Sequence, residues 1–199
     1  MKSNVCKIEK GTHDLENILN ESERVAQYNR LTSKQTLQLR LLCEEIDGML
    51  PNIIDNFKGD IWIEFEEGLC KVQISIQIPD LNIDTKDELI AIAKNKKNSA
   101  AVGIVGKIRN TIEDMLLNES SIGAFTPNYR SICMGMGYCD GLDSSYLWSL
   151  QEYRNTVKKE EKPEDWDELE KSVIASIADD VIVGVRGKQA NITILKKFS

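Results

Sequence analysis

IWIEFEEGLCKVQISIQI, residues 61–78, is the stretch of sequence that decides the fold. Apolar side chains alternate with polar ones on both sides of Glu67 and Gly68, which is the pattern of strands that each bury one face. The Glu-Gly pair interrupts the alternation and is typical of a turn. The sequence therefore predicts an antiparallel hairpin with one solvated face and one buried face.

Apolar residues at helical spacing lie on both sides of this hairpin. They predict helices over residues 14–29, 35–50 and about 99–117, and a last helix marked by Trp166, Leu169, Val173 and Ile177. A second hairpin is predicted over 181–194. Each strand pair offers one apolar face and each helix one apolar stripe. We therefore expect an α/β (α+β) two-layer sandwich, with the helices on one face of a mostly antiparallel mixed sheet.

Residues 118–162 are the exception to this regular pattern. Periodicity there is weak, and glycines and tyrosines are scattered among polar residues. Two interpretations remain: an excursion with its own short elements, or a mobile lid. We expect residues 1–199 to form a single domain with an inserted or elaborated segment at about 118–162.

Charge and composition exclude several classes of function. The 199 residues contain 32 acidic and 25 basic side chains, for a formal net charge of −7, so we expect no nucleic-acid partner. No apolar run reaches the roughly 18 residues of a membrane span, and the first residues do not resemble a secretion signal, so we expect a cytoplasmic protein. His13 and the cysteines form no metal-ligand pattern, and the cysteines are expected to be reduced thiols, with Cys43 and Cys70 in the core.

Three stretches together resemble a known family: residues 39–45 (LRLLCEE), the paired strands ending at Ile78, and residues 176–197 from SIADDV to ITILKK. In order and spacing they are similar to the GHKL, or histidine-kinase-like, ATPase fold, and within it to the anti-sigma-factor serine kinases of bacteria. The likeness covers about 15–96 and 165–199. It implies a bacterial regulatory protein whose partner is a sigma factor or an anti-sigma antagonist.

The family's nucleotide chemistry requires residues that this chain lacks. A Glu-x-x-x-Asn sequence supplies a carboxylate that activates the attacking group and an amide oxygen for magnesium. The matching positions are Glu45 and Met49, and a thioether is a poor ligand for a hard cation. The adenine-binding Asp-x-Gly-x-Gly corresponds to residues 78–82, where Ile78 replaces the aspartate and glycine is absent. Acidic residues at 164–168 would repel a triphosphate.

An active ATP-binding protein, a serine kinase or an ATPase, is the alternative. Its site would be rebuilt from displaced residues: Glu45 as the catalytic candidate, and Asp80, Gly103 and Lys107 as ligands of ATP and magnesium. Residues 101–103 would then be a displaced phosphate loop, although Gly103 and Gly106 on a helix would equally permit close packing. Residues 103–107 do not fit the P-loop pattern. This alternative predicts an open polar pocket beside the helix over 35–50.

We expect instead a non-catalytic regulatory or protein-binding module, derived from an anti-sigma-kinase-like domain that has lost its nucleotide site. In this hypothesis Met49, Ile78 and Leu81 fill the space where the family holds ATP. No cofactor, metal or catalytic residue is expected. The expected partner is a protein, with no nucleic acid and no membrane, and self-association into a homodimer is left open.

Overall fold

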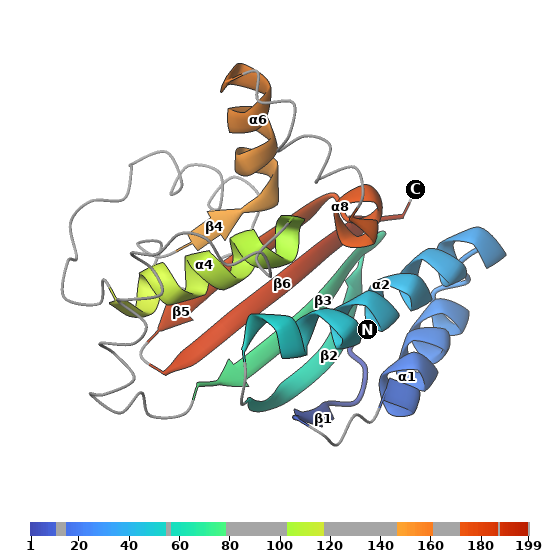
Figure 1. The fold of residues 1–199 in the computed structure, drawn as a ribbon. Coiled ribbons are helices and arrows are strands. Elements are labelled where there is room, and N and C mark those ends of the chain that lie inside the picture. The colour runs from blue at the N-terminus through green and yellow to red at the C-terminus, as the bar shows by residue number, and fades with distance from the viewer. Residues whose placement is uncertain are drawn as a thin grey trace.

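The computed structural model describes residues 1–10, 15–54, 57–78, 103–117, 147–160, 172–186 and 188–198. Within these ranges the strands form one sheet in the order β1-β2-β3-β6-β5-β4, and neighbouring strands are antiparallel (Figure 1). The elements, in chain order, are β1 (Cys6–Glu9), α1 (Leu15–Tyr28), α2 (Ser33–Ile53), β2 (Lys58–Glu66), β3 (Leu69–Gln77), α4 (Gly103–Leu117), β4 (Leu147–Ser149), α6 (Leu150–Glu160), α8 (Val173–Ile177), β5 (Asp180–Arg186) and β6 (Gln189–Lys197).

The central hairpin forms as the alternation predicts. Glu66 and Leu69 are paired across a two-residue turn in which both Glu67 and Gly68 have positive φ, 48° and 82°. Such a turn matches the right-handed twist of the strands that it joins. Alternate side chains of β2 and β3 are buried, among them Ile63 and Ile74, and they form the floor of the core.

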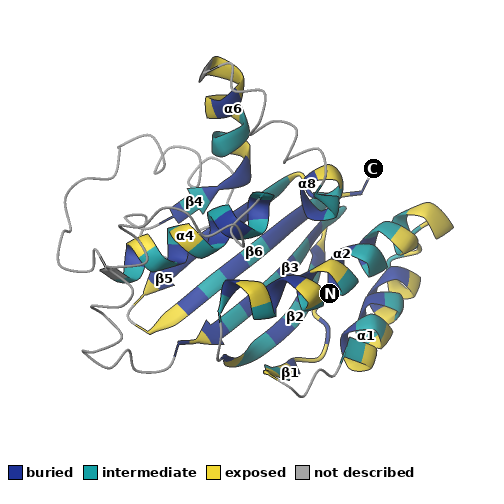
Figure 2. Ribbon diagram, viewed as in Figure 1, coloured by how far each residue is buried: buried dark blue, intermediate teal, exposed yellow. Residues whose placement is uncertain are grey.

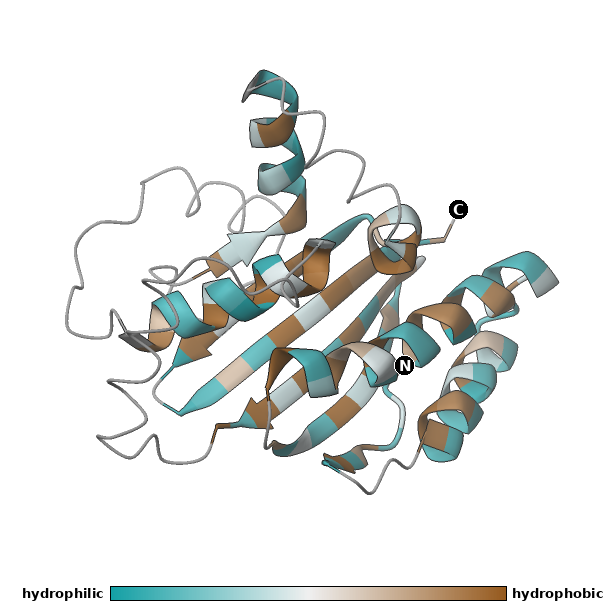
Figure 3. Cartoon of the chain, viewed as in Figure 1, coloured by the Kyte–Doolittle hydropathy of each residue, from teal (hydrophilic) through white to brown (hydrophobic). Residues whose placement is uncertain are grey.

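Helices α1, α2, α4 and α8 lie over one face of the sheet (Figure 1). The buried positions of α2 and of the central strands face each other across this layer boundary, and hydrophobic residues alternate along the strands (Figures 2 and 3). The largest buried side chains of the core include Leu39, Leu42, Ile46, Ile61, Ile74, Ile108, Ile192 and Ile194. The two-layer arrangement is confirmed. The parallel pairing that a mixed sheet requires does not occur among the described strands.

Strand β5 departs from the predicted alternation. Every residue from Val181 to Val185 is buried, including Ile182 on the face away from Val183. The strand was predicted to bury only one face. Its sequence, VIVGV, contains no polar residue, which is the pattern of a strand buried on both sides.

Two further parts of the sheet have no counterpart in the predicted elements. Strand β1 pairs with β2, and the N–H of Ser3 donates to the carbonyl of Ile63 at 2.8 Å, so residues near the N-terminus cover this edge. At the other edge, β4 and α6 lie inside 118–162, where the sequence shows little periodicity. Of the two interpretations of that segment, short elements of its own are present at 147–160.

A polar junction fixes α6 to the sheet. The Asp180 carboxylate accepts hydrogen bonds from the Ser149 hydroxyl at 3.0 Å and from the Gln151 N–H at 2.9 Å. The Arg154 guanidinium donates to the carbonyls of Ala175 within α8, of Ala178 at its C-cap and of Asp179 just beyond it. Burial raises the pKa of the Asp180 carboxyl above its usual value, although its hydrogen bonds act in the opposite direction.

Several sequence predictions concern single residues. Cys43 and Cys70 are fully buried free thiols, as predicted. His13, Cys133, Cys139, Trp166 and Leu169 lie outside the described residues. None of the helices in the described ranges is long and apolar enough to cross a membrane.

Candidate functional site

The candidate site is built on α2. This helix begins with a capping box, in which the Thr32 hydroxyl accepts from the Gln35 N–H and the Gln35 side chain accepts from the Thr32 N–H. Its buried stripe packs on the sheet. Glu45, Gly48 and Asn52 are exposed and lie at positions i, i+3 and i+7, which places them on one side of the helix.

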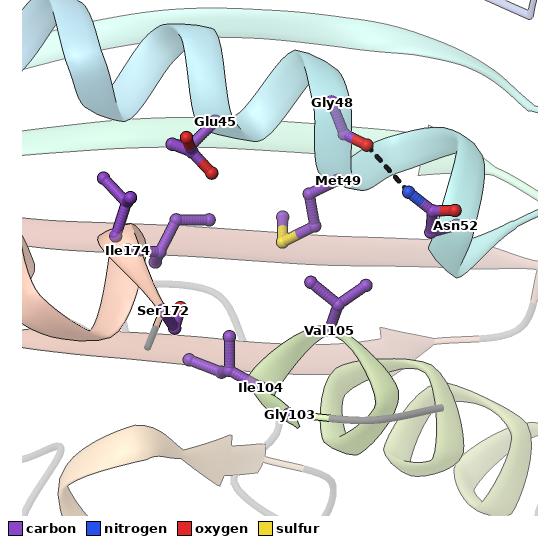
Figure 4. A pocket seen from close by; sticks show the side chains of 10 residues that line it. Glu45, Gly48, Met49, Asn52, Gly103, Ile104, Val105, Ser172 and Ile174 are labelled. Carbon is purple, nitrogen blue, oxygen red and sulfur yellow. Dashed lines mark hydrogen bonds between the residues drawn. The ribbon is translucent and has the colours of Figure 1, made fainter. Parts of the chain in front are cut away.

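A cavity of about 520 Å³ lies between this side of α2, the first turn of α4 and the start of α8. Its volume is in the range of small-molecule sites. The side chains of Met49, Ile104, Val105 and Ile174 converge on it (Figure 4). The remaining described lining residues are Glu45, Gly48, Asn52, Gly103, Ser172 and Val173.

Among the described residues, Met49 and Ile78 do not fill the space beside α2 as predicted, and the part of that prediction that rests on Leu81 stays a prediction. Met49 is 3% exposed and forms part of the wall without closing the cavity. Ile78 is not among the described lining residues, because its N–H donates to the carbonyl of Lys188 at 2.8 Å and its side chain is buried at the end of β3. Leu81 lies outside the described residues.

The oxygen-bearing side chains that the described residues present to this cavity do not form a magnesium site. Glu45 and Asn52 are seven residues apart, and a helix rises 1.5 Å per residue, so they are separated by about 10.5 Å along the axis. A single magnesium ion binds its ligands at about 2.1 Å, so it cannot bridge the two side chains. The side chain between them is the thioether of Met49. Among the described residues no group of three His, Cys, Asp or Glu side chains is placed to hold a metal.

Of the four residues predicted from the sequence, the structure brings two together. Glu45 and Gly103 both line the cavity, where Gly103 is the first residue of α4 and has a φ of 79°. Lys107 is directed elsewhere, because its ammonium group lies over the ring of Tyr153 on α6, 5.1 Å from the centroid. Asp80 lies outside the described residues. Gly106 is buried within α4, which agrees with its interpretation as a packing residue.

Two polar residues of the cavity were missed by the sequence analysis. Asn52 follows Glu45 at i+7, and this spacing alone would have placed it on the same side of the helix. Its amide donates to the Gly48 carbonyl at 2.9 Å. Ser172 caps α8 by accepting from the Ala175 N–H at 3.2 Å, and a serine before the apolar pair at 173–174 is the signal that would have identified it.

The charge in the cavity is negative. Glu45 is the one ionisable side chain among the described lining residues. Its carboxylate has no hydrogen bond or ion pair with another described residue, whereas the neighbouring Glu44 is paired with Arg40 at 3.1 Å. An unpaired carboxylate beside an apolar wall can accept a hydrogen bond from a bound molecule or pair with its positive charge.

Comparison of the chain with protein-family models, with curated proteins and with solved structures finds no match.

Proposed function

We propose that this chain is a non-catalytic regulatory module that binds a protein partner and has lost the nucleotide chemistry of the GHKL-like domains that its sequence resembles. One observation carries this proposal. At the positions where that chemistry needs a carboxylate and an amide one turn apart, α2 has Glu45 and the buried thioether of Met49. Without a second oxygen ligand, Glu45 has no partner with which to hold magnesium against a phosphate.

The proposed partner is a sigma factor or an anti-sigma antagonist, as the resemblance implies. Exposed apolar side chains support a protein-binding role. Tyr28, at the end of α1, is 73% exposed, and Leu37, in the second turn of α2, is 56% exposed. Both flank the turn that joins the two helices. Aromatic side chains are frequent among the residues that dominate the energy of protein interfaces.

A thermal shift measurement with magnesium ATP tests the loss of the nucleotide site. A ligand at a hundredfold excess over its dissociation constant stabilises the folded protein by about 2.7 kcal/mol. We expect no change in melting temperature at millimolar ATP, with or without magnesium, and no release of phosphate. A clear stabilisation that Glu45→Ala abolishes, with Glu44→Ala as the matched control, would contradict the proposal.

A second candidate function is supported by the open cavity. An active ATP-binding protein would need space beside α2, and the cavity provides it, with the start of α4 at Gly103 on its wall. Glu45 and Gly103 would belong to this site, and Asp80 and Lys107 would complete it. Lys107 would have to leave the ring of Tyr153 to reach a phosphate. The thermal shift measurement separates the two candidates, because only the second predicts stabilisation by ATP.

A further inference from the structure

The cavity contains a glycine that the packing of the protein does not explain. Gly48 lies in the interior of α2, where glycine is less favourable than alanine. A Cβ atom added at Gly48 would meet no heavy atom within 4 Å. By contrast, a Cβ at Gly59 would lie 2.2 Å from the Ser75 carbonyl oxygen, so that glycine is required by strand pairing. Glycine at position 48 leaves the helix backbone open to the cavity, which is one of the uses of glycine at ligand sites.

The chemistry of the wall indicates what would occupy this space. Met49, Ile104 and Ile174 present apolar surface to the cavity from three different helices (Figure 4). Glu45 adds a carboxylate at the end of the cavity near α8, and Asn52 lies near the opposite end. Ligand sites commonly combine an apolar lining with a few polar groups that fix orientation.

From these observations we propose that the cavity binds a small molecule with a compact apolar body and a protonated amine, the body on Met49 and Ile104 and the amine on the Glu45 carboxylate. Burial of the body would supply most of the affinity, because an ion pair with an exposed carboxylate contributes little. The carboxylate would instead select the charge of the ligand. This proposal goes beyond the proposed function, since a regulatory module can bind its protein partner with or without such a molecule.

The proposed amine-binding site is tested with three probes of similar shape and different charge: cyclohexylmethylammonium, cyclohexylmethanol and cyclohexanecarboxylate. Each is titrated into the full chain while amide resonances are followed by NMR. We expect saturable shifts at Ile104 and Ser172 with the ammonium probe, and binding of the carboxylate probe that is weaker by about fivefold or more, the ratio that a modest charge interaction gives. Equal binding of the ammonium and carboxylate probes, or no saturable shift with any probe, would overturn the proposal.

Two variants and one matched control test whether the probes bind in this cavity and pair with Glu45. Glu45→Gln should weaken binding of the ammonium probe by about fivefold and bring it close to that of the alcohol. Glu44→Gln removes the same charge one residue away, on a side chain paired with Arg40, and should leave binding unchanged. Gly48→Leu should abolish binding of all three probes. Loss of charge selection in Glu44→Gln, or full binding in Gly48→Leu, would refute the assignment to this cavity. Titration with magnesium ATP tests the proposed function separately.

Discussion

Gly48→Ala should stabilise the protein, although it changes a residue of the candidate site. The added Cβ meets nothing within 4 Å, so the substitution creates no steric conflict. The expected increase in the free energy of unfolding comes from the backbone, because glycine in a helix interior lowers stability by roughly 0.5–1 kcal/mol relative to alanine. For a chain of 199 residues, 1 kcal/mol corresponds to a shift of about 2–4 °C in melting temperature. We therefore expect an increase of about 1–4 °C.

Gly59→Ala is the matched control for this prediction. The same methyl group placed 2.2 Å from the Ser75 carbonyl oxygen forces β2 and β3 apart, and overpacking of this kind costs about 1–3 kcal/mol. Urea denaturation followed by circular dichroism, together with calorimetry, measures both variants. If Gly48→Ala lowered the free energy of unfolding, the reasoning would be refuted, because position 48 would then be either non-helical or filled by another part of the chain.

Four other predictions concern parts of the fold outside the cavity. Thr32→Ala removes the cap of α2 and should cost about 1 kcal/mol in urea denaturation; an unchanged midpoint would contradict the capping box. Arg154→Met removes the donors to three carbonyls near α8 and should cost about 1–2 kcal/mol, with faster amide exchange in α6; unchanged exchange would count against the junction. Because burial raises the pKa of Asp180, this carboxyl favours folding at low pH, and its contribution is lost as the pH rises through the raised pKa; the difference in unfolding free energy between wild type and Asp180→Asn should therefore fall as the pH rises from acid toward neutral, and a rising difference would refute it. Burial raises the pKa of the Cys70 thiol to about 12 and that of Cys43 further, so neither should be alkylated by iodoacetamide at neutral pH before unfolding, as mass spectrometry of the peptides would show.

The sequence predicted those elements whose hydrophobic period extends over several residues. Strand β2 alternates from Ile61 to Phe65 and strand β3 along most of its length, and the buried stripe of α2 runs from Leu39 to Ile53, about four turns, so these patterns are unambiguous. Strand β4 has three residues and β1 has four, too few for an alternation to be recognised. These edge strands are defined by their pairing with a neighbour, which is a property of the tertiary structure and not of the local sequence.

The site was harder to predict than the fold, because its residues come from three helices. Glu45 was recognised by its place in a motif, and Gly103 by its glycine-rich surroundings. Lys107 was associated with Gly103 by its proximity in the sequence, yet it lies one helical turn further along α4 and faces Tyr153. Ser172 lies 127 positions after Glu45 and lines the same cavity only because α8 packs against α2. Spacing along one helix is readable from sequence, whereas the meeting of separate helices is not.

The cavity exists because the residues on this side of α2 have side chains that are small, charged or bonded to the helix itself. Glu45 carries a charge that favours solvent, Gly48 has no side chain, and the Asn52 amide is bonded back to the carbonyl of Gly48 at 2.9 Å. Glu45 and Met49 line the space from this helix, and a cavity of about 520 Å³ remains beside them. The predicted filling relied in part on Ile78, which strand pairing holds in the sheet. An apolar side chain at position 48 would enter the cavity from its wall without removing any other lining side chain. For this reason Gly48→Leu, more than any substitution of Met49, separates a ligand site from an incidental gap.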